Sequence, residues 1–189
     1  MRNLSCTVLT CTLLTGMAAM PSTTLAQPSD IQFPDNIPRF IGSPPSLDSL
    51  QTTNSDAYSR YAKYYLTLTH PDTAEIPLQR VTIQQRGGTE WINLQEEETT
   101  AFVGTRRNQG EIIPIAEVHQ NRDNQTLEVI FARPISPGTT VSIKLHPLHN
   151  PRWSGAYTFG ITVFPAGEQA QGLYLGSRRL HFYERFRRF

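Results

Sequence analysis

The sequence predicts an all-β protein folded as an antiparallel, immunoglobulin-like β-sandwich of about eight or nine short strands. Apolar and polar residues alternate with a period of two over many segments, which places one face of each strand in a core and the other in solvent. Turn-forming residues separate these segments at short intervals, as in Arg86-Gly87-Gly88, Pro137-Gly138 and Pro165-Ala166-Gly167. No segment shows the 3.6-residue period of an amphipathic helix.

The expected strands follow one another from Tyr61 onward and form one β domain over residues 58–183. The clearest alternation places four apolar residues on one face, namely Tyr157, Phe159, Ile161 and Val163. Similar alternation covers 61–68, 127–131 and 141–146, and shorter runs cover 79–84, 91–94, 100–103, 112–118 and 172–182. We expect further turns at Asn108-Gln109-Gly110, 121–124, 150–151 and 176–177.

Residues 1–26 have the organisation of a secretory signal peptide. A positive start at Arg2 precedes an apolar stretch, and Thr24-Leu25-Ala26 supplies small residues for cleavage before Gln27. A membrane anchor would need about 20 predominantly apolar residues, whereas threonines interrupt this stretch. A lipoprotein cut at Cys11 would leave almost no apolar segment before it. We therefore expect export to the periplasm or the extracellular space.

Composition limits the chemistry of the exported chain. The 189 residues carry 17 basic and 16 acidic side chains, and both cysteines, Cys6 and Cys11, precede the expected cleavage site. Removal of 26 residues from 189 leaves 163 without cysteine, hence without a disulfide or a thiol nucleophile. A near-neutral chain lacks the overall positive charge that is typical of nucleic-acid-binding proteins. Its hydrophobic content of 38% is enough for a folded core.

Residues 27–57 are expected to be an irregular lead-in to the β domain. They contain five prolines, at positions 28, 34, 38, 44 and 45. Proline fixes φ and lacks a backbone N–H, so a helix or a central strand does not fit here. Apolar side chains between the prolines, such as Phe40 and Ile41, should pack partly against the domain.

Several short motifs occur in an order that resembles one family. They are Val81-Thr82-Ile83-Gln84-Gln85-Arg86, Ala101-Phe102-Val103-Gly104-Thr105-Arg106, Pro137-Gly138-Thr139-Thr140-Val141-Ser142-Ile143, Asn150-Pro151-Arg152, Phe159-Gly160-Ile161-Thr162-Val163-Phe164-Pro165-Ala166-Gly167, Gly172-Leu173-Tyr174-Leu175-Gly176 and Leu180-His181-Phe182-Tyr183. Over residues 60–183 the chain resembles the domain of unknown function 2808 family, small exported proteins found mainly in cyanobacteria. This resemblance implies a compartment and a lineage, and it implies no reaction.

Two arginine-bearing turns are candidates for a binding surface. Asn150, Arg152 and Trp153 share one turn, and Arg and Trp are enriched at binding hot spots. The alternative is structural, with Trp153 as a lid on the sandwich edge and Arg152 in an internal ion pair. The second candidate is Arg106 with Arg107, whose guanidinium groups could hold a carboxylate or phosphate. Its alternative is a charged hairpin tip.

Metal-dependent and carboxylate-based catalysis are the other chemistries to weigh. His146 and His149 could supply two zinc or copper ligands, with His181 as a third if its strand lies beside them. Glu96-Glu97-Glu98 could be paired carboxylates of a hydrolase, but consecutive strand residues point to opposite faces and such runs are usually solvated. The sequence contains neither a Gly-x-Ser-x-Gly frame nor a glycine-rich phosphate loop.

The C-terminal segment is both basic and aromatic. Residues 178–189 hold five arginines and four aromatic side chains against one acid. We expect the tail over 184–189 either to contact an envelope protein, a polyanion or an anionic membrane surface, or to be a solvated terminus. An outer-membrane barrel is disfavoured, because Arg185 and Arg187 would face lipid in a last strand ending at Phe189.

Together these observations predict an exported, non-catalytic structural or binding module of the cell envelope. We expect no metal, no cofactor and no nucleic-acid partner. The alternative is a metal- or carboxylate-dependent envelope hydrolase that uses His146 and His149.

Overall fold

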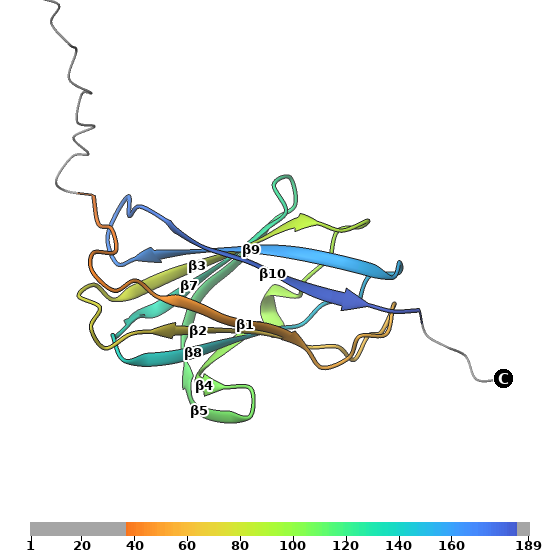
Figure 1. Cartoon of the computed structure of the whole chain (residues 1–189), viewed down its shortest axis with the longest axis horizontal. Helices are drawn as coiled ribbons and strands as arrows, with labels where there is room; N and C mark the ends of the chain where they lie inside the picture. Colours follow the sequence, from red (N-terminus) through yellow and green to blue (C-terminus); the bar gives the residue numbers. More distant parts are fainter. Residues whose placement is uncertain (1–36, 185–189) are drawn as a thin grey trace, which may run out of the picture. The chain divides into compact units, whose positions relative to one another are not determined.

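The computed structural model describes residues 37–184, which form ten β-strands (Figure 1). The first five strands are β1 (Ser46–Thr52), β2 (Tyr64–His70), β3 (Leu78–Gly87), β4 (Thr100–Thr105) and β5 (Asn108–Ile113). The other five are β6 (Ile115–Asn121), β7 (Thr126–Ile135), β8 (Thr139–Leu145), β9 (Gly155–Pro165) and β10 (Leu173–Phe182). A 3₁₀ turn, η1 (Glu96–Glu98), lies between β3 and β4, and this part of the chain contains no α-helix.

The strands form two antiparallel sheets of five strands each. The order in the first sheet is β1-β2-β8-β4-β5, and the order in the second is β10-β9-β3-β7-β6. All the ladders within the two sheets are antiparallel. The predicted all-β, immunoglobulin-like sandwich is therefore confirmed, with ten strands in place of eight or nine.

One apolar core lies between the two sheets. Leu66 on β2 and Ile143 on β8 enter it from the first sheet, and Val129 on β7 enters it from the second. Strand β9 shows the period of two most clearly, because every second residue from Tyr157 to Val163 is buried. Removal of this apolar surface from water is the main source of stability for such a fold.

Strand β1 lies inside the segment 27–57, so the prediction of an irregular lead-in is wrong for these residues. The last of the prolines is Pro45, directly before the strand, and β1 is an edge strand of its sheet. Leu47 and Leu50 are both buried although they are three positions apart, because the ladder to β2 shifts register between Leu47 and Ser49. Such a bulge interrupts the period of two, and the alternation therefore did not reveal this strand.

The single strand expected over 112–118 is in fact parts of two strands, β5 and β6, which belong to different sheets. Pro114 lies between them, where its missing N–H interrupts the ladder. The chain thus passes from the first sheet to the second at this proline. The proline was visible in the sequence, but the change of sheet depends on distant strands.

The turn expected at Asn108-Gln109-Gly110 is also wrong, because these residues begin β5. Thr105 pairs with Asn108 across the hairpin, so Arg106 and Arg107 are themselves the two turn residues. The interpretation of Arg106 and Arg107 as a charged hairpin tip describes their backbone position correctly.

The strand expected at 91–94 is an irregular segment that runs into turn η1. Leu94 forms only an isolated antiparallel bridge, with Pro147, and the rest of the segment is held by the buried side chain of Gln85. Its Oε1 accepts a hydrogen bond from the Ile92 N–H (3.0 Å), and its Nε2 donates to the Glu90 carbonyl (2.7 Å). The apolar residues are therefore buried without a ladder, which a period-two pattern cannot distinguish from a strand.

Strand β10 confirms the strand expected over 172–182 and contains the first two arginines of the basic C-terminal segment. Arg179 is exposed, whereas Arg178 turns toward the first sheet, where Nη2 donates to the Leu47 carbonyl on β1 (2.5 Å). Strands β1 and β10 are edge strands of the two sheets and run side by side in Figure 1. Arg178 therefore joins the two sheets next to the β1 bulge.

Within residues 37–184, no helix has the length and apolar character needed to cross a membrane. The expected signal peptide over 1–26 and residues 185–189 of the predicted tail lie outside the described residues.

Candidate functional site

The loop before β2 and the loop before β9 meet at one end of the sandwich, where the side chain of Asn150 holds them together. Asn150 is fully buried. Its Oδ1 accepts a hydrogen bond from the Tyr64 hydroxyl (2.8 Å), and its Nδ2 donates to the carbonyls of Asn54 (3.0 Å) and Asp56 (2.8 Å). Burial raises the pKa of Tyr64, which keeps its hydroxyl a donor. Asn150 is therefore a structural residue and does not belong to the binding surface expected of it.

Tyr58 connects the same two loops on their outer side. Its N–H donates to the Pro151 carbonyl (2.8 Å), and its φ of +58° is uncommon for an aromatic residue. The Tyr58 and His149 ring centroids are 4.9 Å apart. The guanidinium carbon of Arg152 lies 5.7 Å from the Tyr58 ring centroid, within the range of a cation–π contact. Tyr58 is thereby fixed in a half-exposed position beside Arg152.

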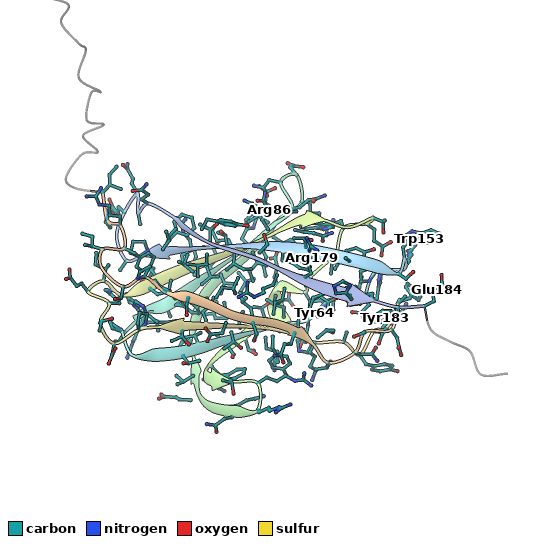
Figure 2. The ribbon with its side chains drawn as sticks, in the orientation of Figure 1. Tyr64, Arg86, Trp153, Arg179, Tyr183 and Glu184 are labelled. Carbon is teal, nitrogen blue, oxygen red and sulfur yellow. The ribbon has the colours of Figure 1, made fainter. Side chains whose placement is uncertain are left out.

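Exposed aromatic side chains lie on these two loops and at the end of β10. We call Tyr58, Tyr61, Arg152, Trp153 and Tyr183 the end surface. Tyr61 is 87% exposed and Trp153 is 65% exposed. Figure 2 shows Trp153 and Tyr183 at the same end of the sandwich, and the Tyr183 backbone is paired with the loop before β2. A cavity of about 240 Å³ lies within that loop.

Arg152 and Trp153 both face solvent, so the structural alternative weighed for them is wrong. Trp153 is too exposed to be a lid on the sandwich edge. Arg152 has no internal ion pair, because the one ion pair within residues 37–184 joins Arg80 to Glu128. The backbone N–H of Arg152 instead donates to Glu90 Oε1 (2.5 Å), which orders the loop and leaves the guanidinium outside.

Arg106 and Arg107 lie at a second place, above the outer face of the first sheet. A cavity of about 370 Å³ lies between them and strand β1. We call it the hairpin cleft, and its lining residues are Asp48, Ser49, Gln51, Thr67, Thr105, Arg106 and Arg107. Strands β1 and β5 are opposite edges of this sheet. The β4–β5 hairpin must therefore fold back across the sheet for its tip to share a cavity with β1.

Gly104 explains how the hairpin bends. Its φ is +97°, a Cβ at this position would collide with the Asn108 backbone oxygen, and the ladder shifts register beside it. A bulge of this kind bends a strand and increases its twist. The Ser142 hydroxyl donates to the Gly104 carbonyl (2.7 Å), which fixes the bend on β8. As a result the Arg106 guanidinium carbon lies 5.5 Å from the Tyr65 ring centroid on β2.

The three histidines weighed as metal ligands do not form a metal-binding group. His149 packs against Tyr58, and His181 is exposed on β10. The Nε2 atom of His146 is buried without a hydrogen-bond partner in this part of the structure, and burial, with help from nearby lysines, lowers the pKa of His146. Among residues 37–184, no three His, Cys, Asp or Glu side chains are placed to hold a metal ion.

The acidic run Glu96–Glu98 forms turn η1 and is not part of a strand. Glu96 Oε1 accepts a hydrogen bond from the Gln120 N–H (2.7 Å) and so attaches the turn to β6. The three acids and Arg122 line a surface hollow of about 370 Å³. Paired-carboxylate hydrolysis needs two acids held on either side of a substrate bond. Here the Glu96 carboxylate instead accepts a hydrogen bond from a backbone N–H.

Sequence reasoning missed Tyr58 and Tyr61 of the end surface and Asp48 and Gln51 of the hairpin cleft, and it included Tyr183 only as an aromatic residue of the basic C-terminal segment. The three tyrosines lie in or beside loops, and an aromatic residue in a polar loop was a usable signal. No comparable signal marked Asp48 and Gln51, because their strand was itself missed.

Comparison with known families agrees with the resemblance seen in the sequence. A family model described as a protein of unknown function (DUF2808) matches residues 39–182, which is more than half of the chain. No curated protein matches the chain in sequence.

Solved structures with a similar fold are distant in sequence. The bacterial hydrophobin BslA is 14% identical, with a TM-score of 0.46, over 76% of this chain and 96% of that one. ACE19, the collagen-binding subdomain of the Enterococcus faecalis surface protein ACE, is 10% identical, with a TM-score of 0.42, over 78% and 97%. The collagen-binding domain of a Staphylococcus aureus adhesin is 10% identical, with a TM-score of 0.38, over 75% and 96%. These likenesses concern the sandwich architecture and assign no ligand to this chain.

Proposed function

We propose, from the premise that the chain belongs to the DUF2808 family of proteins of unknown function, that it is an exported, non-catalytic binding module of the cell envelope. The observation that carries the proposal is the end surface. Trp153 and Tyr61 are more than half exposed, and they lie on the two loops that the buried Asn150 holds together.

The composition of the end surface suits contact with another macromolecule. Tyr, Trp and Arg are the residue types that dominate binding energy at protein interfaces. An exposed indole or phenol ring leaves apolar area in water, which a partner can cover at little further entropic cost when the loop is already ordered. The Asn150 hydrogen bonds and the Tyr58 contacts with His149 and Arg152 provide that order.

Export is proposed from residues 1–26, whose basic start, apolar stretch and small residues are typical of a cleaved signal peptide. N-terminal sequencing of the protein purified from its native cells should begin at Gln27. A chain that still begins at Met1 would contradict export by this route.

The binding role can be tested by photo-crosslinking in intact native cells. We expect Trp153→p-benzoylphenylalanine to give one or a few discrete adducts of higher mass, because position 153 faces the partner. The matched control is Ile112→p-benzoylphenylalanine, since Ile112 is 74% exposed on the hairpin and lies outside the end surface. The same adducts in equal yield from both positions would mean non-specific collision and would contradict the proposal.

The hydrolase alternative requires His146 and His149 to act on one metal or one substrate. Instead, His149 packs on Tyr58 and the Nε2 atom of His146 is buried. We expect the purified protein and its His146→Ala/His149→Ala variant to have the same zinc and copper content by elemental analysis. Stoichiometric metal that the variant loses would support the hydrolase instead.

A further inference from the structure

The hairpin cleft carries two cations that no carboxylate neutralises. Arg106 and Arg107 are both exposed, and neither takes part in an ion pair within residues 37–184. Arg106 is positioned over the Tyr65 ring, and its own carbonyl accepts a hydrogen bond from Gln109 Nε2 (3.1 Å). The guanidinium groups therefore stand at one wall of the cavity with free N–H donors, an arrangement that suits a planar carboxylate.

The opposite wall carries a single carboxylate, which is held in a fixed orientation. Asp48 Oδ1 accepts a hydrogen bond from the Ser46 hydroxyl (3.1 Å), and Oδ2 accepts one from the Thr69 hydroxyl (2.6 Å). Each carboxylate oxygen can accept a further hydrogen bond. Asp48 is thus an ordered acceptor that lines the same cleft as the two arginines.

The remaining lining groups are amides and hydroxyls. Gln51 is exposed on β1, and Thr105 is exposed on the hairpin. Thr67 lies between the walls, with its hydroxyl 2.9 Å from the buried Ser142 hydroxyl. Gln51 and Thr105 can both donate to and accept from a ligand that is rich in hydroxyls, whereas Thr67 donates to Ser142 and can only accept. The volume of about 370 Å³ lies in the range of small-ligand sites.

We propose that the hairpin cleft binds a uronic-acid unit of an acidic polysaccharide. Arg106 and Arg107 bind the sugar carboxylate, and Asp48 and Gln51 accept hydrogen bonds from the ring hydroxyls. A uronate carries both an anion and hydroxyl donors, which matches a cleft with guanidinium groups on one wall and a carboxylate on the other. The site goes beyond the proposed function, because it shares no lining residue with the end surface.

The same features argue against other ligands. A phosphodiester group or a sulfate brings an anion for the arginines but no hydroxyl donor for Asp48, whereas a uronate brings both. A nucleic acid would need an exposed ring for base stacking, and Tyr65 is 7% exposed beneath Arg106. A neutral sugar would leave two guanidinium groups without an anion.

Binding can be measured by isothermal titration of the full-length protein with a galacturonate tetrasaccharide and with a galactose tetrasaccharide. We expect the galacturonate to bind at least about tenfold more tightly, since a hydrogen bond to a charged group is worth about that factor. Inorganic sulfate at equal concentration should not displace the galacturonate. Equal affinity for the neutral sugar, or full displacement by sulfate, would overturn the proposal.

Variants show whether the hairpin cleft is the place where galacturonate binds. Arg106→Gln/Arg107→Gln should weaken galacturonate binding by about tenfold or more. The control Arg133→Gln/Arg179→Gln removes the same charge from exposed residues that do not line the cleft and should leave the affinity unchanged. An equal loss in both double variants would show that only overall charge matters and would overturn the site. If the first double variant does not fold, Arg107→Gln alone gives the same test at the hairpin tip.

The Asp48→Asn variant distinguishes a cleft that binds a saccharide from a cleft that binds only a simple anion. If Asp48 accepts hydrogen bonds from sugar hydroxyls, the variant binds galacturonate more weakly than the unmodified protein. If the cleft holds only an anion, removal of a negative charge makes binding tighter, and that result would overturn the proposal. Neither outcome affects the crosslinks expected from position 153. The proposal for the hairpin cleft and the proposal for the end surface can therefore be refuted independently.

Discussion

Residues 37–184 contain two Arg-Arg dipeptides, and the fold uses them in opposite ways. Arg106 and Arg107 form a two-residue turn, where both side chains are exposed at the rim of the hairpin cleft. Arg178 and Arg179 lie in strand β10, where the period of two sends their side chains to opposite faces. Arg178 donates to the Leu47 carbonyl between the sheets, and Arg179 is exposed. Residue type alone therefore does not separate a binding arginine from a structural one.

The loop before β9 repeats this contrast over four residues. Asn150 is buried and makes three side-chain hydrogen bonds, whereas Arg152 and Trp153 are exposed. Surface groups available for binding thus stand next to groups that the fold requires. Substitution of each member of such a pair separates the two roles.

The largest effect is expected at Asn150. Asn150→Ala leaves the buried Tyr64 hydroxyl without its partner and removes one donor from each of two backbone carbonyls, and a buried unpaired group is costly. We expect the free energy of unfolding to fall by about 3 kcal/mol in chemical denaturation. Trp153→Ala, three positions away, should change it by less than about 0.5 kcal/mol. Similar losses in both variants would mean that Trp153 is structural.

A smaller effect is expected at the seam between β1 and β10. Arg178→Ala removes a charge-assisted hydrogen bond to a backbone carbonyl and should lower the free energy of unfolding by about 1.5 kcal/mol. Arg179→Ala is the matched control, and it should stay within about 0.5 kcal/mol of the unmodified protein. If Arg179→Ala destabilises as much as Arg178→Ala, the assignment of the two faces is wrong.

Buried His70 and exposed His181 differ in how they should affect the free energy of unfolding as the pH changes. His70 is buried at the end of β2, and burial lowers its pKa despite its hydrogen bond with the Ile76 carbonyl. The folded protein therefore keeps His70 neutral at a pH where the unfolded chain binds a proton. Stability that is present above about pH 6.5, the usual histidine pKa, is lost as the pH falls below it. His181 is exposed and serves as the control.

The expected result is a fall in the free energy of unfolding between pH 7.5 and about pH 5 that is smaller in His70→Gln. Glutamine keeps a donor for the Ile76 carbonyl but does not titrate. His181→Gln should show the full fall. Identical pH profiles for the unmodified protein and His70→Gln would contradict the assignment of this loss to His70.

The smallest effect on stability is expected at the hairpin tip. Arg106→Ala/Arg107→Ala should change the free energy of unfolding by less than about 0.5 kcal/mol, because both side chains are exposed and neither is in an ion pair within residues 37–184. A loss as large as that of Arg178→Ala would make the hairpin arginines structural and weaken the contrast between the two dipeptides.

Most of the fold could be predicted because its strands obey the period of two. The run from Tyr157 to Val163 is buried at every second position, and strand β9 covers it. Strand β1 could not be predicted in this way, because its bulge places Leu47 and Leu50 on one face at a spacing of three. The segment 91–94 was wrongly predicted as a strand, because one isolated bridge at Leu94 and the side chain of Gln85 hold its apolar residues in the core without a ladder.

The candidate site was predictable only in part. Residue type and turn context make Arg152, Trp153, Arg106 and Arg107 candidates, and the structure adds that all four are exposed. Their surroundings depend on contacts between distant segments, such as Tyr58 with His149 and Arg106 with Tyr65. The burial of Asn150 depends on a hydrogen bond with Tyr64, 86 positions earlier in the chain, which local sequence does not encode.

The central claim is that Tyr61, Arg152 and Trp153 act as one binding surface. It is tested most directly by Tyr61→p-benzoylphenylalanine in native cells, with and without Arg152→Ala/Trp153→Ala. We predict a discrete adduct from position 61 that the double substitution abolishes, while the free energy of unfolding stays within about 0.5 kcal/mol. An adduct that persists at full yield would contradict the claim.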